Sequence, residues 1–427
     1  MVLKERKRQG KNWLKWLKSW SSFEKGKAGF SYFPSEDLHL WVFKTYKMND
    51  MKGKQGLVCM GLLLVLSSCH TGKQITASGL QRKDFQTEVN GQHTDLFTLS
   101  NKQGMEVCIT NYGARVVSIL VPDRNGKRED VVCGFSTITE YMEQRQNFGS
   151  TVGRYIGRIL NARFTLDGVE YKLVPNNGKS GHISHGGNPG FADRIWKVEQ
   201  ADTHRVRLSY LSPDGENGFP GNLKVTLVYS LGEDDNALDL TYEATTDAPT
   251  VLNLSHHSFF NISGNFTKSV EDQQLWVDAD RFTPYDDKKC VTGEYLPVAG
   301  TPLDFRMPHA IGECIDADHP QLKVVNGYDH TWELNTKGDD TRPAAWVYDP
   351  ASGRKMEIFT TEPGMQIYTG NGLKGKMTGK GGIAYPFRSA VCFETMHFQD
   401  SPNQPGFPST VLRPGEVFRS HTVYKFE

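Results

Sequence analysis

Two adjacent histidines, His256 and His257, lie in the stretch VLNLSHHSFFNISG (residues 251–264), where alternating apolar and polar residues predict a β-strand. Side chains on a regular strand point alternately to opposite faces, so the two histidines would not bind the same metal ion. His256 shares its face with leucines, which favours a hydrogen-bonded core histidine. His257 shares its face with an asparagine and a serine, and this polar setting is compatible with either a structural role or proton transfer.

A third histidine, His185, lies in the glycine-rich segment SGHISHGGNPGF. Gly186 and Gly187 would allow the backbone to approach a ligand closely, and Phe191 would offer an apolar surface for it. The segment is therefore a candidate ligand-binding loop.

Two carboxylates are candidates for acid–base chemistry. Asp329 lies in NGYDHTW, and Glu394 lies inside the otherwise apolar strand AVCFETMHF. An ionised carboxylate is rarely buried without a partner, so Glu394 is expected to have a paired charge or a functional role. Arg154 and Arg158, in VGRYIGRI, are expected to face the same side of one strand, one in a structural ion pair and the other in contact with substrate.

Together with Gln366 and scattered aromatic side chains, these groups suit a polyhydroxylated ligand and general acid–base chemistry. The sequence contains no Cys-x-x-Cys pair, no His-Glu-x-x-His motif, no nucleophile-elbow serine and no glycine motif for phosphates or dinucleotides. We therefore expect a reaction that needs neither a metal nor an organic cofactor.

The elements that must position these groups are strands. From about Phe97 onward, short alternating runs are separated by Gly, Pro, Asn and Asp, and helical periodicity is scarce. Tight turns are predicted at Asp167-Gly168 and at Asn125-Gly126, because both dipeptides supply the positive φ angles that hairpins require. The chain is thus expected to be all-β, a large antiparallel β-sandwich of roughly 330 residues with no linker dividing it.

The N-terminal part departs from this pattern. Residues 1–50 carry 11 Lys and Arg against 5 Asp and Glu, whereas the chain after residue 68 carries 36 against 44, a formal charge of −8 that disfavours nucleic-acid binding. Between them, MKGKQGLVCMGLLLVLSSC (51–69) has a lysine-containing start, an apolar stretch too short to span a bilayer comfortably, and small residues before Cys69. This order resembles a bacterial lipoprotein signal, in which Cys69 becomes the lipidated first residue after cleavage.

We therefore expect four regions. They are a mis-assigned leader or basic membrane-surface segment at 1–50, with Met51 as the true start, a lipoprotein-type signal peptide at 51–68, a polar tether at 69–91 and the β-sandwich domain at 92–427. The protein would be exported to the periplasm and anchored to a membrane by a lipid on Cys69. The five cysteines that follow Cys69 are irregularly spaced and indicate no disulfide framework.

Several separate stretches, in the same order along the chain, resemble aldose 1-epimerases of the galactose mutarotase family over roughly residues 92–427. They are FGSTVGRYIGRILNARFTLDGVEY, HGGNPGFADRIW, LNLSHHSFFNISG, GEYLPVAGTPLDFR, NGYDHTW, EPGMQIYTGN and AVCFETMHFQDSPNQPGFPSTVLRPGE. The resemblance implies a large antiparallel β-sandwich, or supersandwich, with a sugar cleft on its concave face and a small sugar as its partner.

Carried over motif by motif, the resemblance makes Glu394 the catalytic base and His257 the acid. Four further residues would bind sugar hydroxyls or support the acid: His185, Arg158, Asp329 and Gln366. Interconverting α and β anomers requires removal of the C1 hydroxyl proton, protonation of the ring oxygen, rotation of the open aldehyde and the reverse transfers. The histidine is expected to start protonated, kept charged by a nearby acid such as Asp329 or Glu394.

Two stretches depart from the family pattern and bear on hydrogen bonds to the distal hydroxyls. Gly157 stands before Arg158 where family members often have Asn, and Ser-His-His stands where Thr-Asn-His is usual. Two other functions compete with the epimerase: a carbohydrate-binding sandwich without catalysis, against which the presence of both Glu394 and His257 argues, and a hexose-phosphate 1-epimerase, which would need further arginines near the cleft. The oligomeric state and the preferred aldose do not follow from the sequence.

Overall fold

The computed structural model describes residues 31–35, 38–42 and 74–427, which belong to two units, residues 1–70 and 71–427. In the first unit, β1 (Ser31–Ser35) pairs with β2 (Leu38–Val42) in antiparallel fashion. The expected signal peptide at 51–68 and the lipidation site Cys69 lie outside the described residues. No helix in the described part of the chain is long and apolar enough to cross a membrane.

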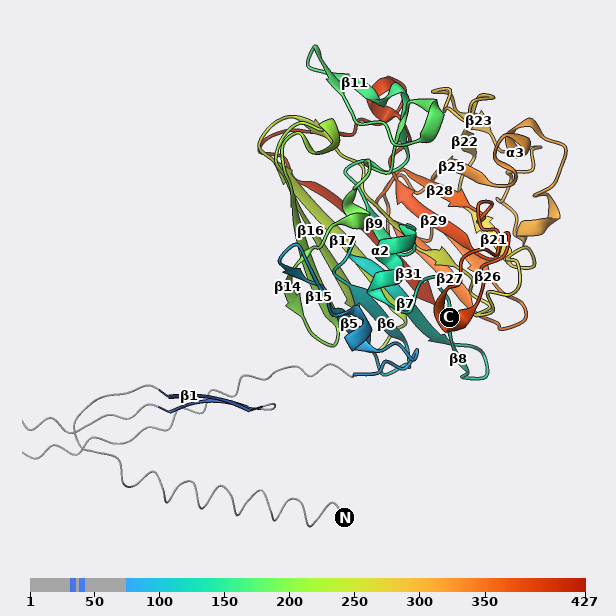
Figure 1. Ribbon diagram of the computed structural model, residues 1–427. Coiled ribbons are helices and arrows are strands. Elements are labelled where there is room, and N and C mark those ends of the chain that lie inside the picture. Colours follow the sequence, from blue (N-terminus) through green and yellow to red (C-terminus); the bar gives the residue numbers. More distant parts are fainter. Residues whose placement is uncertain (1–30, 36–37, 43–73) are drawn as a thin grey trace, which may run out of the picture. The chain divides into compact units, whose positions relative to one another are not determined.

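Antiparallel sheets make up most of the second unit, as the alternating sequence predicts (Figure 1). The largest sheet has nine strands. In order across the sheet they are β14 (Lys197–Ala201), β15 (Arg205–Ser212), β16 (Leu223–Leu231), β17 (Ala237–Thr246), β31 (Phe418–Phe426), β27 (Lys355–Thr360), β26 (Ala345–Tyr348), β21 (Gln274–Val277) and β24 (His309–Ala310).

Two smaller sheets and several short pairs complete the unit. The six-stranded sheet is ordered β20 (Phe259–Phe260), β29 (Val391–Met396), β28 (Gly364–Tyr368), β25 (Asp329–Glu333), β22 (Arg281–Thr283) and β23 (Leu296–Pro297). The four-stranded sheet is ordered β5 (Leu96–Ser100), β6 (Glu106–Thr110), β7 (Arg115–Pro122) and β8 (Arg128–Asp130). The short pairs are β3 (Glu88–Val89) with β4 (Gln92–His93), β9 (Ser150–Val152) with β19 (Ser255–His257), β10 (Arg158–Ile159) with β13 (Ile183–Ser184), β11 (Arg163–Leu166) with β12 (Val169–Lys172), and β18 (Thr250–Val251) with β30 (Val411–Leu412). The two α-helices of this unit are α2 (Ile138–Gln144) and α3 (Pro320–Val325).

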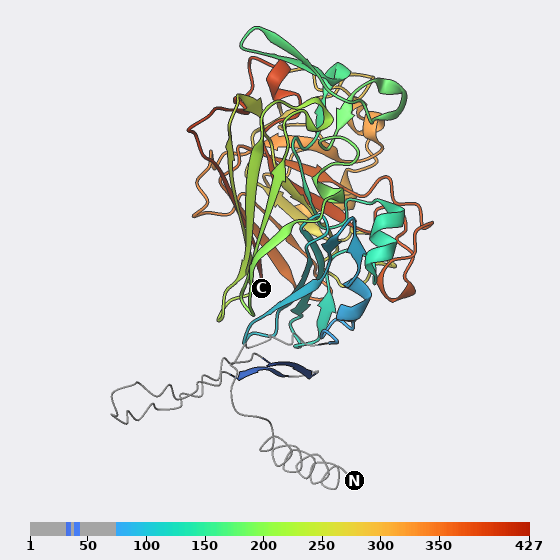
Figure 2. The same cartoon turned by 60° about the vertical axis from the view of Figure 1, so that its left-hand side comes forward.

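The nine-stranded and six-stranded sheets pack face to face. Tyr424 on β31 donates a hydrogen bond to the carbonyl of Phe393 on β29 at 2.9 Å, and the hydroxyls of Thr395 and Thr422 lie 2.7 Å apart between the same two strands. In Figure 2 the yellow-green strands β15 to β17 form one long layer, and the four-stranded sheet lies beside it. Apolar side chains from all three sheets form one continuous core.

The turn prediction at Asp167-Gly168 is confirmed. β11 (Arg163–Leu166) and β12 (Val169–Lys172) pair directly across these two residues, whose φ angles are 51° and 80°. The packed domain also extends N-terminal to Gln92, because Phe85, in the segment expected to be a tether, is fully buried in a second apolar cluster.

The segment 251–260 is not one regular strand. It is divided among β18, β19 and β20, which pair with β30, β9 and β29 respectively. His256 lies beside the core rings of Tyr229 and Tyr424, whereas His257 lies beside His185 and lines the pocket, so the expected separation of the two histidines onto opposite faces is correct.

Candidate active site

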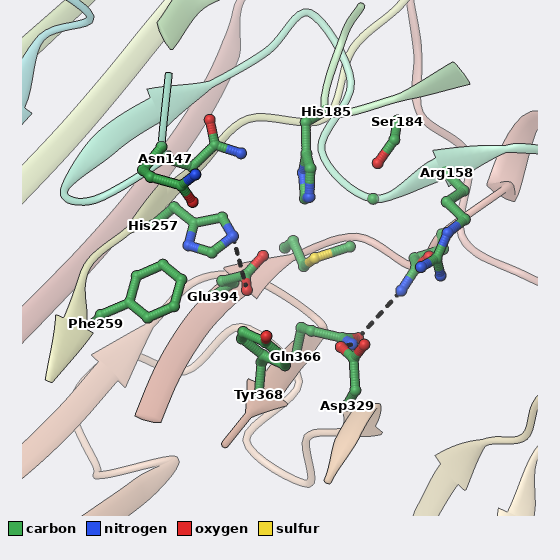
Figure 3. Close-up of a pocket in the computed structure, with 14 residues that line it drawn as sticks. Asn147, Arg158, Ser184, His185, His257, Phe259, Asp329, Gln366, Tyr368 and Glu394 are labelled. Carbon is green, nitrogen blue, oxygen red and sulfur yellow. Dashed lines mark hydrogen bonds and ion pairs between the residues drawn. The ribbon is translucent and has the colours of Figure 1, made fainter. Parts of the chain in front are cut away.

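A pocket of about 240 Å³ opens on the six-stranded sheet, on the face turned away from the core. All six residues expected to bind sugar or to transfer protons line it, although they come from five different strands and one loop (Figure 3). They are Arg158, His185, His257, Asp329, Gln366 and Glu394.

Strand register brings two of these residues, Gln366 and Glu394, side by side. Gln366 on β28 stands opposite Thr331 on β25 and opposite Glu394 on β29, so the three side chains form a row across the sheet. Alternate residues of β29, such as Phe393, point into the core instead. Glu394 is therefore an acid on the pocket face of a strand whose other face is apolar, which explains its position in the sequence.

His257 and Glu394 form the centre of the pocket. The Nε2 atom of His257 lies 3.4 Å from Oε1 of Glu394, and the two side chains are only 7% and 5% exposed. The imidazole stacks on Phe259, with ring centroids 5.1 Å apart, and meets His185 edge-on at 5.4 Å. Aromatic contacts on two sides fix the ring plane, so its Nε2 atom stays directed at the carboxylate.

Burial sets the protonation of this pair. It raises the pKa of Glu394 well above its usual range, an effect reinforced by the charge of Asp329, and it lowers the pKa of His257 well below its usual range, reinforced by His185. Burial also lowers the pKa of His185 to about 4. A charged histidine was expected from the sequence, but desolvation favours the neutral form of each group.

Both shifts favour a state in which the pair holds one proton between its two groups. A carboxylic acid beside a neutral imidazole has the same number of protons as a carboxylate beside an imidazolium. One proton transfer across the 3.4 Å contact converts the first form into the second. Sugar hydroxyls that donate to the carboxylate would favour the charged form.

Asp329 and Gln366 form a polar cluster at the other side of the pocket, near Arg158 (Figure 3). The Nε2 atom of Gln366 donates to Oδ1 of Asp329 at 2.6 Å. Burial raises the pKa of Asp329, while the positive charge of Arg158 and the hydrogen bond from Gln366 oppose that rise. The cluster offers a carboxylate, an amide and a guanidinium, which are groups that can bind hydroxyls in a fixed orientation.

The glycines after His185 have a different role from the expected one. A Cβ atom on Gly186 would lie 1.9 Å from the carbonyl oxygen of Gly153, and one on Gly187 would lie 2.6 Å from the side chain of Asn217. They allow the loop to approach protein backbone and a neighbouring side chain rather than a ligand. His185 itself has a positive φ of 51° and is directed into the pocket.

The expectation that Arg154 and Arg158 share one face is wrong. The chain leaves strand geometry between β9 and β10, so only Arg158 lines the pocket. Arg154 is 2% exposed, and its guanidinium donates to the carbonyls of Pro220 and Gly221 at 2.7 and 3.0 Å. Arg154 is thus structural, held by hydrogen bonds, and it provides no cation for the phosphate of a hexose phosphate.

Several further residues line the pocket that were not expected from the sequence, among them Phe259, Tyr368 and Gln399. Tyr368 lies two residues after Gln366 on β28, and Phe259, at the start of β20, lies two residues after His257, so the alternation of the sequence could have identified both. Gln399 follows β29 in a loop and enters the pocket beside Gly157. No local pattern in the sequence indicates that position.

One group among the described residues has the geometry to hold a metal ion. Ligand atoms of His257, Cys392 and Glu394 all lie within 4.8 Å of one another, and all three residues are buried. Cys392 and Glu394 share the pocket-side face of β29 because they are two residues apart. Nitrogen, sulfur and oxygen donors of this kind suit Zn²⁺.

A β-sandwich pocket that pairs a buried carboxylate with an imidazole, and surrounds them with hydroxyl-binding groups, defines a carbohydrate-active enzyme that moves protons. The family model described as aldose 1-epimerase matches residues 95–425. The chain belongs to the aldose 1-epimerase family, a family of isomerases.

Relatives and solved structures agree with this assignment. The chain is 39% identical to galactose mutarotase from Sus scrofa over 330 residues, 77% of this chain and 93% of that protein. It is 36% identical to aldose 1-epimerase from Escherichia coli (strain K12) over 339 residues, 79% of this chain and 96% of that protein. A solved GalM/aldose epimerase homologue from C. elegans aligns with a TM-score of 0.72 at 31% identity, covering 78% of this chain and 99% of that one.

Proposed function

We propose that this protein interconverts the α and β anomers of free aldohexoses, with galactose and glucose as substrates, by general acid–base catalysis. The observation that carries the proposal is the buried contact of 3.4 Å between His257 and Glu394 on the floor of a polar pocket. One group of the pair can accept a proton while the other donates one, and the reaction needs both transfers.

In the proposed reaction, Glu394 removes the proton of the C1 hydroxyl while His257 protonates the ring oxygen and the bond between C1 and that oxygen breaks. The open aldehyde then rotates about the bond between C1 and C2. His257 takes back the proton, the ring closes on the other face of C1, and Glu394 returns its proton to the new C1 hydroxyl. Each positioned group is expected to contribute about 10² to 10⁴ in rate.

Arg158, His185, Asp329 and Gln366 would hold the remaining hydroxyls. Their donors and acceptors line the part of the pocket that extends from the Glu394–His257 pair toward Arg158 (Figure 3). Rigid placement of the sugar keeps C1 and the ring oxygen next to the pair while the open chain turns.

The enzyme is expected to accelerate mutarotation of fresh α-galactose and α-glucose, and to keep full activity after exhaustive chelation, because a carboxylate and an imidazole suffice for both proton transfers. Polarimetry with and without chelator measures this. Activity that disappears on chelation and returns with Zn²⁺ would contradict the metal-free mechanism and would point to His257, Cys392 and Glu394 as ligands.

The acid limb of the pH profile of kcat/KM is expected below the ordinary histidine range near ~6.5. The active pair holds one proton, and activity is lost when a second proton binds. Burial lowers the pKa of His257 well below its usual range, so this second protonation happens only at lower pH. The raised pKa of Glu394 has the opposite effect on the alkaline limb, because the pair then loses its single proton only at higher pH. An acid midpoint at or above that ordinary value would contradict this protonation scheme.

We also propose that the protein is exported and carries a lipid on Cys69, based on the apolar segment and the sequence Leu-Ser-Ser-Cys. A Cys69→Ala variant is expected to accumulate uncleaved and without lipid, which intact mass and lipid labelling in the bacterial host would measure. Cys59→Ala is the matched control, because Cys59 lies within the apolar segment rather than at its cleavage site. Normal processing of Cys69→Ala would reject the anchor.

A further inference from the structure

Gln399 occupies the space beside Gly157 that a side chain at position 157 would otherwise fill. Gly157 has a φ of +75°, and a Cβ atom built on it would lie 2.5 Å from Cγ and 3.1 Å from Cδ of Gln399. Both residues line the sugar pocket, next to Arg158. The side chain of Gln399 can therefore occupy this space only because residue 157 has no side chain.

The backbone around Gln399 is held firmly against the strand that carries Arg158. The amide of Asp400 donates to the carbonyl of Arg158 at 2.8 Å, and the carboxylate of Asp400 accepts from the amide of Leu160 at 3.0 Å. On the other side, Tyr155 donates its hydroxyl to the carbonyl of Phe398 at 3.1 Å. Gln399, which is only 4% exposed, thus enters the pocket from an anchored loop.

A chain of hydrogen bonds fixes which way the Gln399 amide points. An ionised Asp329 can only accept, so the amide nitrogen of Gln366 faces it at 2.6 Å and the Gln366 carbonyl oxygen faces away. That oxygen accepts from the Gln399 amide nitrogen at 3.3 Å, and the same nitrogen donates to the hydroxyl of Tyr285 at 2.6 Å. Both amide hydrogens of Gln399 are therefore used by the protein.

The carbonyl oxygen of Gln399 is left as a free acceptor. Within residues 74–427 it receives no hydrogen bond from the protein, and its side chain borders the pocket. A carbonyl oxygen that lacks a donor, on a side chain that lines a sugar pocket, gains from one, and sugar hydroxyls are donors.

We propose that Gln399 is a substrate-binding residue that determines sugar specificity, its carbonyl oxygen accepting a hydrogen bond from an aldose hydroxyl on the Arg158 side of the pocket. It thereby takes the place of a side chain at position 157. This inference rests on the proposed aldose 1-epimerase function, because the ligand is the sugar substrate of the same pocket.

The first test replaces Gln399 with methionine, which keeps an unbranched side chain of similar length but removes the amide oxygen. One lost hydrogen bond to a neutral group predicts a KM for galactose raised roughly 3- to 10-fold. The kcat should change less than about 2-fold, because the bond is expected equally in the ground state and the transition state. Thermal melting checks that the variant is folded.

The second test exploits the packing. Gly157→Asn is compatible with a positive φ, since asparagine tolerates it, but its Cβ would displace Gln399, so KM should rise. Truncating the neighbour in Gly157→Asn/Gln399→Ala removes the clash, and its KM should fall below that of Gly157→Asn alone. Additive effects of the two substitutions would contradict the shared space.

Monodeoxy galactoses separate a direct contact from a general disturbance of the pocket. The analogue that lacks the contacted hydroxyl should give the same KM with the wild type and with Gln399→Met, whereas the other analogues should still distinguish them. An unchanged KM of Gln399→Met for every sugar, or an equal rise for every analogue, would overturn the inference.

Calorimetry measures the Kd of galactose for the same variants, and so it tests the Gln399 contact separately from turnover. If the wild type binds galactose but does not accelerate mutarotation, the proposed function fails while a weaker Kd of Gln399→Met still supports the contact. If the wild type is active and Gln399→Met binds and turns over as the wild type does, the inference alone fails. No galactose binding by the wild type would overturn both.

Discussion

Replacing Glu394 with glutamine is expected to lower kcat for galactose mutarotation by a factor on the order of 10² or more. Glutamine keeps the shape and hydrogen-bonding capacity of the side chain but has no basic carboxylate, so the C1 hydroxyl proton loses its acceptor. The side chain would keep its place in the row with Gln366, because strand register sets that position. Sugar should therefore still bind, and calorimetry beside polarimetry separates the two effects.

Glu362 offers a matched control for this substitution. Its carboxylate is also buried, at 2% exposed, and also contacts an imidazole, with Nδ1 of His397 at 2.7 Å, but it does not line the pocket. Glu362→Gln should lower the melting temperature and leave kcat of the folded enzyme near that of the wild type. Wild-type turnover by Glu394→Gln, or equal inactivation by both variants, would show that the carboxylate at 394 is not the proton acceptor.

Local periodicity accounts for the parts of this fold that the sequence predicts well. Strand β16 (Leu223–Leu231) alternates buried and partly exposed residues along its whole length, and the same rule separated His257 from His256 in the sequence. The turn at Asp167-Gly168 is equally local, because two adjacent residues supply both positive φ angles. Such features need no knowledge of distant segments.

Features that depend on distant segments were not predictable in this way. The contact between Gln366 and Asp329 follows from the register of β25 against β28, which no window of sequence contains. Arg154 and Arg158 look equivalent in the sequence, but the carbonyls that hold Arg154 come from residues more than sixty positions away. The pKa of His257 depends on burial by aromatic and strand neighbours, so its direction became clear only from the packing.

Replacing His257 with asparagine is expected to lower kcat by a factor on the order of 10² to 10⁴, because protonation of the ring oxygen stabilises mainly the transition state. Binding of sugar should change much less than turnover. His256→Asn is the matched control, since it alters the same residue type one position earlier. His256 is 2% exposed, and its Nε2 atom lies 2.6 Å from the hydroxyl of Ser258 on the core side of the strand.

The two variants should therefore fail in different ways. His256→Asn removes an imidazole packed between the rings of Tyr229 and Tyr424, at 6.2 and 6.0 Å, and should lower the melting temperature while the folded fraction keeps its kcat. His257→Asn should stay folded, as circular dichroism would show, and lose turnover by polarimetry. If both fold but only His256→Asn loses turnover, the proton donor is not the imidazole that faces Glu394, and the acid–base assignment fails together with the strand register on which it depends.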